Sequence, residues 1–227
     1  MLEKLSEHPL RKELIHHPFL KEIRTGAAPI TKEAVGTLLG QWWYPLDFFP
    51  TFLSRSISVL PDRDMQTALS KILYQELGEG RPANSHGKLF ITTMADAGFP
   101  EEVTTHAPAF PETRQLVDLY EETSHNPLRA LGAVYGTEVA DLAMVSGVGQ
   151  AVRAVSGVKE LPWVDIHVLQ EPEHVEQASE ALEPNFTAEE EAVIQSAAED
   201  MWRGWIKFFD RIRAEAHAEA PVAVAAH

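Results

Sequence analysis

The chain has 227 residues, of which 44% are hydrophobic and 23% charged, a balance typical of one ordinary globular domain. Its formal net charge of −15 argues against nucleic acid and anionic membrane surfaces as partners. Cysteine is absent, which excludes disulfides, thiolate metal ligands and cysteine nucleophiles and fits a cytoplasmic protein. Neither a secretory signal nor a run of about 20 apolar residues is visible, so we expect no membrane span.

Helical periodicity and helix-breaking residues organise the first sixty residues. A short helix ends near Gly26, and Thr31 caps a longer one. Pro45 and Pro50 interrupt this second helix and predict a kink. Aromatic residues crowd the same stretch, where core packing is the simpler interpretation and a wall for a buried substrate pocket is the functional one. These aromatic residues are Trp42, Trp43, Tyr44, Phe48 and Phe49.

The next expected helix covers residues 62–77 and ends where two glycines and a proline follow. Ser85 then caps a helix that begins with His86. Glu76 and His86 should therefore face each other across a tight turn between two helices. Residues 100–111 are expected to be irregular.

The helix that follows Asn126 is apolar on most sides, which predicts a buried element. Asn126 is followed by proline, and this pair marks a helix start. Glu138 lies in the middle of the helix, where a carboxylate is unfavourable unless it is paired, protonated or bound to a cation. Arg129 or Arg153 would serve as that cation, and so would a metal ion. Residues 147–157, rich in small side chains, are expected to form a connection.

The most informative stretch belongs to the helix expected over residues 161–182. His167, Glu171 and His174 stand in the order His-x3-Glu-x2-His. At about 100° per residue, the three side chains fall within roughly 60° of one another on a helix. An exposed face with salt bridges would explain this stripe, and so would a metal site. Pro172 should distort the backbone beside it.

The last helix begins at a capping box formed by Thr187 and Glu190. It should end near residue 214, and residues 215–227 are expected to be a disordered tail. No alternation typical of strands is visible. The sequence therefore predicts a single all-α domain over residues 1–214, a bundle of roughly seven helices.

Four of the expected helices carry carboxylates and imidazoles that a small bundle would bring together. Oxygen and nitrogen ligands without sulfur suit iron or manganese, and helix bundles hold two metals between Glu and His side chains of facing helices. A histidine or glutamate of this kind, taken alone, more often lies on the surface or is hydrogen-bonded in the core. The joint occurrence of these residues favours a metal site. Glu79 competes with Glu76, which we prefer because it still lies on its helix. The candidate metal ligands are Glu76, His86, Glu138, His167, Glu171 and His174.

These residues, in this order, make the chain similar to the heme-oxygenase-like diiron oxidases and oxygenases. Supporting motifs are His17-Pro18-Phe19-Leu20, residues 75–82 before His86, and Tyr135-Gly-Thr-Glu138, and the similarity extends over about residues 10–212. The resemblance implies a seven-helix, heme-oxygenase-like bundle that binds two Fe(II) ions and uses O₂ as co-substrate.

The resemblance also implies an activity on a small-molecule substrate. Family members carry out N-oxygenation, as monooxygenases, or desaturation or oxidative C–C cleavage of amino acids and fatty acids, frequently in natural-product biosynthesis. Arg81 and Arg153 are candidate anchors for a substrate carboxylate, and a homodimer is compatible with the sequence. Two features depart from the family: it usually has aspartate in place of Glu171, and Pro172 directly after it is unexpected.

Within this resemblance we expect each iron to have three ligands. Glu76, His86 and Glu138 would hold one iron, and the His167, Glu171 and His174 stripe would hold the other. Glu138 would bridge the two ions, because it lies on the most buried helix.

Other readings stay open. Thiaminase-like relatives of this fold use a cysteine nucleophile, which the chain lacks, and a cofactor-free oxidase resembling the late-acting quinone-cofactor enzyme would leave Glu138 unexplained. A heme-dependent oxidase would need an axial histidine near the N-terminus, for which His8, His16 and His17 are candidates. A non-enzymatic helical interaction module would make the His/Glu stripe a solvated face.

Overall fold

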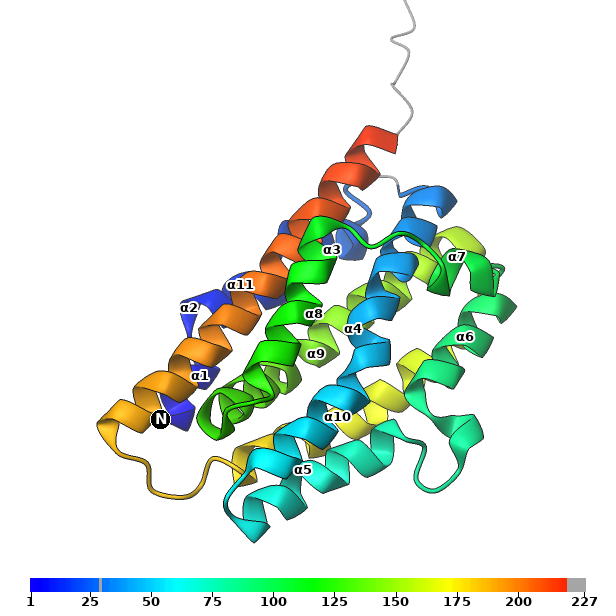
Figure 1. Ribbon diagram of the computed structural model, residues 1–227. Helices are drawn as coiled ribbons and strands as arrows, with labels where there is room; N and C mark the ends of the chain where they lie inside the picture. Colours follow the sequence, from blue (N-terminus) through cyan, green and yellow to red (C-terminus); the bar gives the residue numbers. More distant parts are fainter. Residues whose placement is uncertain (29, 220–227) are drawn as a thin grey trace, which may run out of the picture.

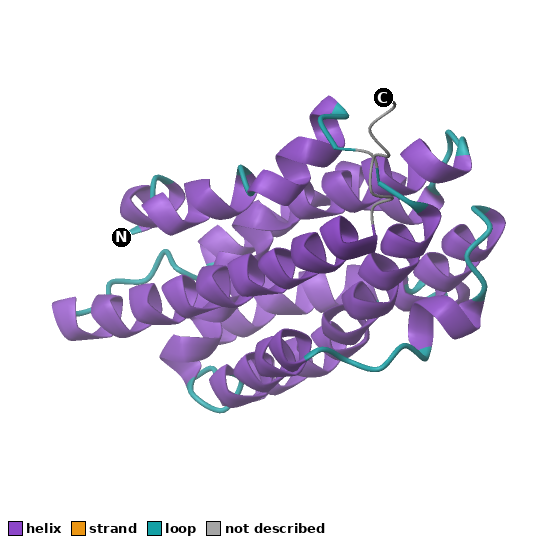
Figure 2. Ribbon diagram, turned by 90° about the horizontal axis from the view of Figure 1, so that it is seen from above, coloured by secondary structure: helices purple, strands orange, loops and turns teal. Residues whose placement is uncertain are grey.

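The computed structural model describes residues 1–28 and 30–219, and across these residues it contains helices and loops but no strand (Figure 1; Figure 2). The all-α class predicted from the sequence is therefore confirmed. A short 3-10 helix, η1 (Pro82–Asn84), accompanies the α-helices. These are α1 (Leu2–Ser6), α2 (Pro9–Ile15), α3 (Pro18–Thr25), α4 (Lys32–Val59), α5 (Arg63–Glu76), α6 (His86–Asp96), α7 (Glu101–Thr105), α8 (Pro111–Thr123), α9 (Pro127–Ser156), α10 (Pro162–Glu180) and α11 (Ala188–Glu219).

The expected number of about seven helices is wrong, because short helices form before α4 and between α6 and α8. Two His-Pro pairs divide the N-terminal segment into α1, α2 and α3. At each pair the histidine is the N-cap: Nδ1 of His8 accepts the Leu10 N–H, and Nδ1 of His17 accepts the Phe19 N–H. In addition, α7 lies within the stretch over 100–111 that was expected to be irregular.

Helix α4 is longer than its prolines predict. The Thr31 side chain caps it as expected, accepting the Ala34 N–H at 3.1 Å. The helix then continues through Pro45 and Pro50, so the prolines do not end it, and the kink expected there stays a prediction. Tertiary packing explains this result, since α4 lies against α5, α7, α8 and α9 along its length.

Helix α9 forms the centre of the bundle and also continues further than expected. It packs against α10, α11 and α4, and its N-cap is Asn126, as predicted. The connection expected over residues 147–157 is wrong, because the helix includes this stretch up to Ser156. Its small residues permit close packing instead: a Cβ on Gly147 would lie 2.5 Å from Leu20, and one on Gly149 would lie 2.9 Å from Val164.

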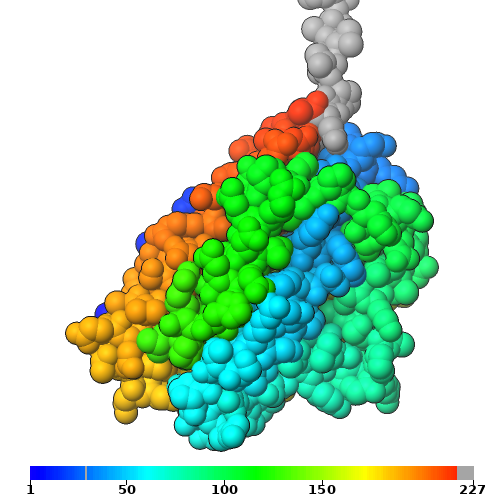
Figure 3. Space-filling model, in the orientation of Figure 1, coloured from blue at the N-terminus to red at the C-terminus, as the bar shows by residue number. Residues whose placement is uncertain are grey.

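The outer helices enclose this centre. On the face seen in Figure 3, α4, α8 and α11 lie side by side and form a continuous surface. The buried apolar side chains of the described residues form one core cluster. No helix among residues 1–28 and 30–219 is long and apolar enough to cross a membrane.

Helix α11 extends to Glu219, so the part of the predicted tail over 215–219 is helical. Residues 220–227 lie outside the described residues. The predicted capping box precedes this helix: the Thr187 N–H donates to Glu190 Oε2 at 2.8 Å, and the Glu190 N–H donates to Thr187 Oγ1 at 3.2 Å.

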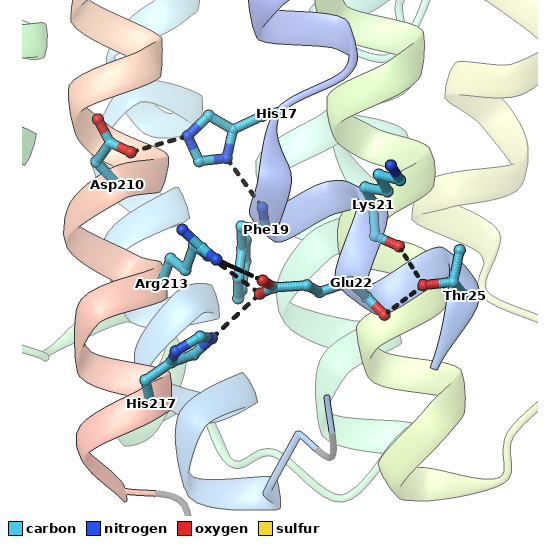
Figure 4. A network of polar contacts seen from close by, with 8 residues as sticks. All are labelled: His17, Phe19, Lys21, Glu22, Thr25, Asp210, Arg213 and His217. Atoms are coloured by element: carbon cyan, nitrogen blue, oxygen red, sulfur yellow. Dashed lines mark hydrogen bonds and ion pairs between the residues drawn. The ribbon is translucent and has the colours of Figure 1, made fainter. Parts of the chain in front are cut away.

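A set of polar contacts fastens α3 to α11 (Figure 4). The Arg213 guanidinium donates to both carboxylate oxygens of Glu22, and His217 contacts the same carboxylate at 3.1 Å. One turn away, His17 Nε2 donates to Asp210 at 3.2 Å. We call the contacts of Glu22 with Arg213 and His217 the α3–α11 clasp.

Candidate metal centre

The structure brings the six predicted ligands together in the interior, between α5, α6, α9 and α10. Glu76 is the last residue of α5, and His86 is the first residue of α6. Glu138 comes from the middle of α9, and the His-x3-Glu-x2-His stripe comes from α10. None of the six is more than 4% exposed. The stripe is therefore not a solvated face, which removes the observation that favoured a simple interaction module.

One group of potential ligand atoms consists of Glu76, His86 and His167, which lie within 4.8 Å of one another. Nδ1 of His86 is 2.9 Å from Oε2 of Glu76, and Nε2 of His86 is 3.1 Å from the Gln170 side-chain oxygen. Both ring nitrogens thus face oxygen acceptors: burial lowers the pKa of His86, but Glu76 outweighs burial and raises it, so the metal-free ring carries a proton that a metal ion would replace. Two ligand atoms at about 2.1 Å from a metal and about 90° apart are separated by about 3.0 Å, which matches this pair.

His167 is positioned by the backbone of its own helix. Its Nδ1 donates to the Trp163 carbonyl at 2.7 Å, which leaves Nε2 as the atom with a free lone pair. Metal-binding histidines commonly donate their second nitrogen to a carbonyl or carboxylate in this way. Burial, with positive charge on His86, lowers the pKa of His167 to about 3, so the ring is neutral and suited to ligation.

The second group consists of Glu138, Glu171 and His174, again within 4.8 Å. Nδ1 of His174 lies 3.3 Å from Glu138 and 3.7 Å from Glu171. Burial lowers the pKa of His174, but the surrounding carboxylates, chiefly Glu138, outweigh it and raise the pKa to about 9. Glu138 therefore has the cationic partner that its buried position demands, and this partner is neither Arg129 nor Arg153.

The grouping differs from the expected one. His167 lies with Glu76 and His86, whereas Glu138 lies with the other two members of the stripe. The expected division assigned all three residues of α10 to one metal because they share a helix face. A rise of about 1.5 Å per residue separates the ends of the stripe by about 10 Å, so one helix contributes to both groups.

Sequence reasoning missed one residue of the site, Asp141. It follows Glu138 by three positions on α9, and its carboxylate lies within 4.8 Å of ligand atoms of His167 and Glu171. The Glu138-x2-Asp141 spacing was the available signal, because residues three apart share a helix face. Burial, with the negative charge of Glu138, raises the pKa of Asp141 to about 7, while a hydrogen bond with Glu171 opposes the rise.

The turn between α5 and α6 favours Glu76 over Glu79. Glu79 is exposed and has a φ of 54°, so its side chain is outside the interior. Gly78, at a φ of 84°, makes the turn tight, since a Cβ there would lie 2.4 Å from the Arg81 carbonyl oxygen. Ser85 holds the N-cap position but makes no capping bond, because its hydroxyl donates to the Pro82 carbonyl.

The proline after Glu171 leaves α10 intact. The helix is continuous from Pro162 to Glu180 and keeps both His167 and His174 buried. The distortion expected at Pro172 therefore does not remove any member of the stripe from the interior.

An aromatic pocket borders the ligands. Of the aromatic residues that the sequence analysis singled out on α4, Trp42 and Phe49 line it. The candidate anchors Arg81 and Arg153 do not: Arg81 is exposed, and Arg153 contacts Asp165 at 3.3 Å. The pocket is lined by Trp42, Pro45, Leu46, Phe49, Glu76, Tyr120, Thr137, Glu138, Asp141, Trp163, His167, Glu171 and Trp205.

A short chain of hydrogen bonds crosses the wall of this pocket. Trp205 Nε1 donates to the Tyr120 hydroxyl at 3.1 Å, and the Tyr120 hydroxyl is 2.9 Å from Thr137 Oγ1. Thr137 donates to the Ala133 carbonyl, so Tyr120 donates to Thr137. Burial raises the pKa of Tyr120, which keeps the phenol protonated.

The N-terminal histidines do not resemble an axial heme ligand. His8 and His17 use Nδ1 to cap helices, and their Nε2 atoms contact Glu199 and Asp210. His16 is exposed. None of the three lines the aromatic pocket.

The donor set fits metal ions. Several buried ligand atoms have no hydrogen-bond partner among the described residues, although buried polar atoms are normally paired. A metal would satisfy them, and the oxygen and nitrogen donors are those that iron and manganese accept. Oε1 of Glu138, Oε2 of Glu171 and Nε2 of His174 are such atoms, whereas Nδ1 of His86 and Nδ1 of His174 face the carboxylates of Glu76 and Glu138 at 2.9 and 3.3 Å.

Solved structures share this fold along the whole chain. A CADD-like protein of unknown function from Nostoc punctiforme matches with a TM-score of 0.78 at 13% identity, over 94% of each chain. A domain of unknown function with a heme oxygenase-like fold from Shewanella denitrificans matches with a TM-score of 0.76 at 17% identity, over 100% of this chain and 96% of that one. A TenA homologue from Pseudomonas syringae pv. tomato matches with a TM-score of 0.73 at 16% identity, over 93% of this chain and 92% of that one.

At these identities the solved structures show the fold alone, and they confirm the predicted heme-oxygenase-like architecture. Among curated proteins, none matches the sequence significantly. The family model described as iron-containing redox enzyme matches residues 37–206, which is more than half of the chain and includes every candidate ligand. The chain belongs to this family of iron-containing redox enzymes.

Proposed function

We propose that the protein is an O₂-dependent, non-heme diiron oxidase or oxygenase that acts on a small organic substrate. The observation that carries this proposal is the pair of buried ligand groups, Glu76–His86–His167 and Glu138–Glu171–His174, at the base of an aromatic pocket. When bound, two ferrous ions would supply the electrons for reducing O₂. The protein residues around them hold, orient and shield the reacting groups.

Each part of the site has a role in this proposal. The hydrogen bond from Nδ1 to the Trp163 carbonyl fixes the rotamer of His167, so its Nε2 is already oriented for ligation. The buried carboxylates balance the charge of the metals. The tryptophans and Phe49 exclude water from the substrate, and the Tyr120 hydroxyl offers one polar contact on that wall.

The pocket supports a substrate whose buried part is apolar. No lysine or arginine stands among its lining residues in the described part of the chain, so the aromatic wall would hold an aliphatic or aromatic group. An amino acid or a fatty-acid-like carboxylate remains the substrate class we propose. N-oxygenation, desaturation and oxidative C–C cleavage, as in natural-product pathways, are the candidate reactions.

The direct test is anaerobic loading with Fe(II), followed by metal analysis and O₂ consumption against panels of amino acids and fatty acids. We expect two irons per chain and O₂ uptake that one class of compound accelerates. His174→Ala should lose the iron of the second group, leaving at most one per chain, and should abolish O₂ uptake. His125→Ala is the matched control, because His125 lies in the turn after α8, its side chain is 61% exposed, and it does not line the pocket. Absence of iron binding and O₂ uptake in the unaltered protein would refute the proposal.

A further inference from the structure

Asp141 is a carboxylate of α9 that the set of six ligands leaves out. Asp141 lies on the wall of the aromatic pocket together with Glu138, His167 and Glu171. Its ligand atom shares a 4.8 Å cluster with one residue of each group, His167 from the first and Glu171 from the second. Glu138, by contrast, clusters only with the second group. Asp141 thus occupies the position between the two groups.

Two buried carboxylate oxygens beside Asp141 have no hydrogen-bond partner among the described residues. Glu171 is 2% exposed and its Oε2 has no partner, and Oε1 of the equally buried Glu138 has none. Among the described residues, no lysine or arginine lies within ion-pair distance of Asp141, Glu138 or Glu171, so His174 is the one cationic group there. Burial and the neighbouring carboxylates raise the pKa of Glu171 and of Asp141, so these groups take up protons in the metal-free protein, and a bound cation would replace those protons.

Charge balance gives a second, independent reason. The six-ligand set contains three carboxylates, which would leave a net charge of about +1 around two divalent ions with neutral histidines. Adding Asp141 makes four carboxylates, and the same two ions then give a neutral buried centre. A neutral centre is the arrangement that a low-dielectric interior favours.

We propose that Asp141 is a seventh protein ligand and is shared between the two metal ions, in the bridging place that the sequence suggested for Glu138. The proposal rests on the two-metal function proposed above. In it Glu138 is a ligand of the second ion alone. The competing role for Asp141 is an outer acid that only hydrogen-bonds Glu171.

The test uses the full chain and Mn(II) under anaerobic conditions, with calorimetry for stoichiometry and affinity and EPR for coupling between the two ions. The unaltered protein should bind two Mn(II) and show an exchange-coupled spectrum. Asp141→Asn, which keeps the shape and removes the charge, should lose the coupling. Its second Mn(II) should be weakened beyond the roughly 10- to 100-fold loss typical of an outer-shell partner.

Two further variants complete the experiment. Asp141→Glu retains a carboxylate and should bind two ions with a coupled spectrum, which also guards against an Asn variant that fails to fold. Asp118→Asn removes an exposed aspartate of α8 and should behave as the unaltered protein. If Asp141→Asn binds two Mn(II) with unchanged affinity and coupling, Asp141 is not a ligand and the two-metal proposal still stands. If the unaltered protein binds fewer than two ions, both proposals fail.

Discussion

Glu138 and His174 form the most consequential pair of residues in the metal-free protein. They are 2% and 1% exposed and stand 3.3 Å apart. Removing one member of a buried pair leaves the other charge uncompensated, which typically destabilises a protein by about 3–5 kcal/mol. We therefore expect Glu138→Gln and His174→Gln each to lower the free energy of unfolding of the metal-free protein by about that amount.

The double variant should be less destabilised than the sum of the two singles, because neither charge is then left alone. Urea unfolding of all four proteins measures this coupling. Additive effects would mean that the two side chains do not interact as an ion pair.

The same pair gives the metal-free protein a pH dependence on the alkaline side. The pKa of His174 is raised from 6.5 to about 9 in the folded protein, so its stabilising contribution is fully present below pH 6.5 and is lost as the pH rises through 9. Between pH 7 and 9.5, the melting temperature of the metal-free protein should fall more than that of His174→Gln. Differential scanning calorimetry measures both, and parallel slopes would contradict the assignment.

At acidic pH, Glu76 makes the stability of the metal-free protein depend on pH in the opposite direction. Burial would raise its pKa, but His86 outweighs burial and lowers the pKa from 4.5 to about 2. Its contribution to stability is thus present above pH 4.5 and is lost as the pH falls towards 2. The two ends of the pH range therefore report on different ligand groups.

At the scale of elements, the contact between α9 and α11 depends on glycine. A Cβ added at Gly132 would lie 2.1 Å from the Ile194 carbonyl oxygen, so the helices would have to separate. Gly132→Ala should lower the free energy of unfolding by about 1–3 kcal/mol, the usual effect of overpacking. Gly87→Ala is the control: its Cβ would meet Trp43 at 3.7 Å, and alanine in a helix should leave stability unchanged or raise it. Urea midpoints compare the two variants.

The elements also show where sequence reasoning succeeds and where it fails. Helix starts at Thr31, Asn126 and Thr187 were predictable because their side chains bond the backbone locally. The end of α9 was not, since its small residues look like a loop until α3 and α10 are seen packed against them. Similarly, the prolines of α4 look disruptive until its neighbours are known.

The site follows the same rule. Glu138 was identifiable because a carboxylate in an apolar helix needs a partner, and the α10 stripe because its spacing is fixed by helix geometry. The division into two groups, and the place of Asp141, depend on how four helices are rotated about their axes. Local sequence patterns do not predict that rotation.

For the whole molecule, metal binding should act as a stabilising ligand. Ions that bind only the folded state raise its stability by about 2.7 kcal/mol when the free concentration is 100 times Kd. For a chain of this length, that corresponds to a rise in melting temperature of roughly 5–10 °C. Thermal unfolding with and without Mn(II) measures the rise, and the Glu138→Gln/His174→Gln variant is the control that should lose most of it. An equal rise in that variant would place the metal elsewhere.

The α3–α11 clasp has a consequence for the order in which the protein folds. Glu22 and Arg213 are 191 positions apart, so their contact closes a very long loop and forms late. During synthesis α11 leaves the ribosome after every candidate ligand from Glu76 to His174. Until α11 is made, Glu22 lacks its contacts with Arg213 and His217, and the pocket lacks the wall that Trp205 provides. The ligand helices are thus synthesised before the helix that completes the pocket wall.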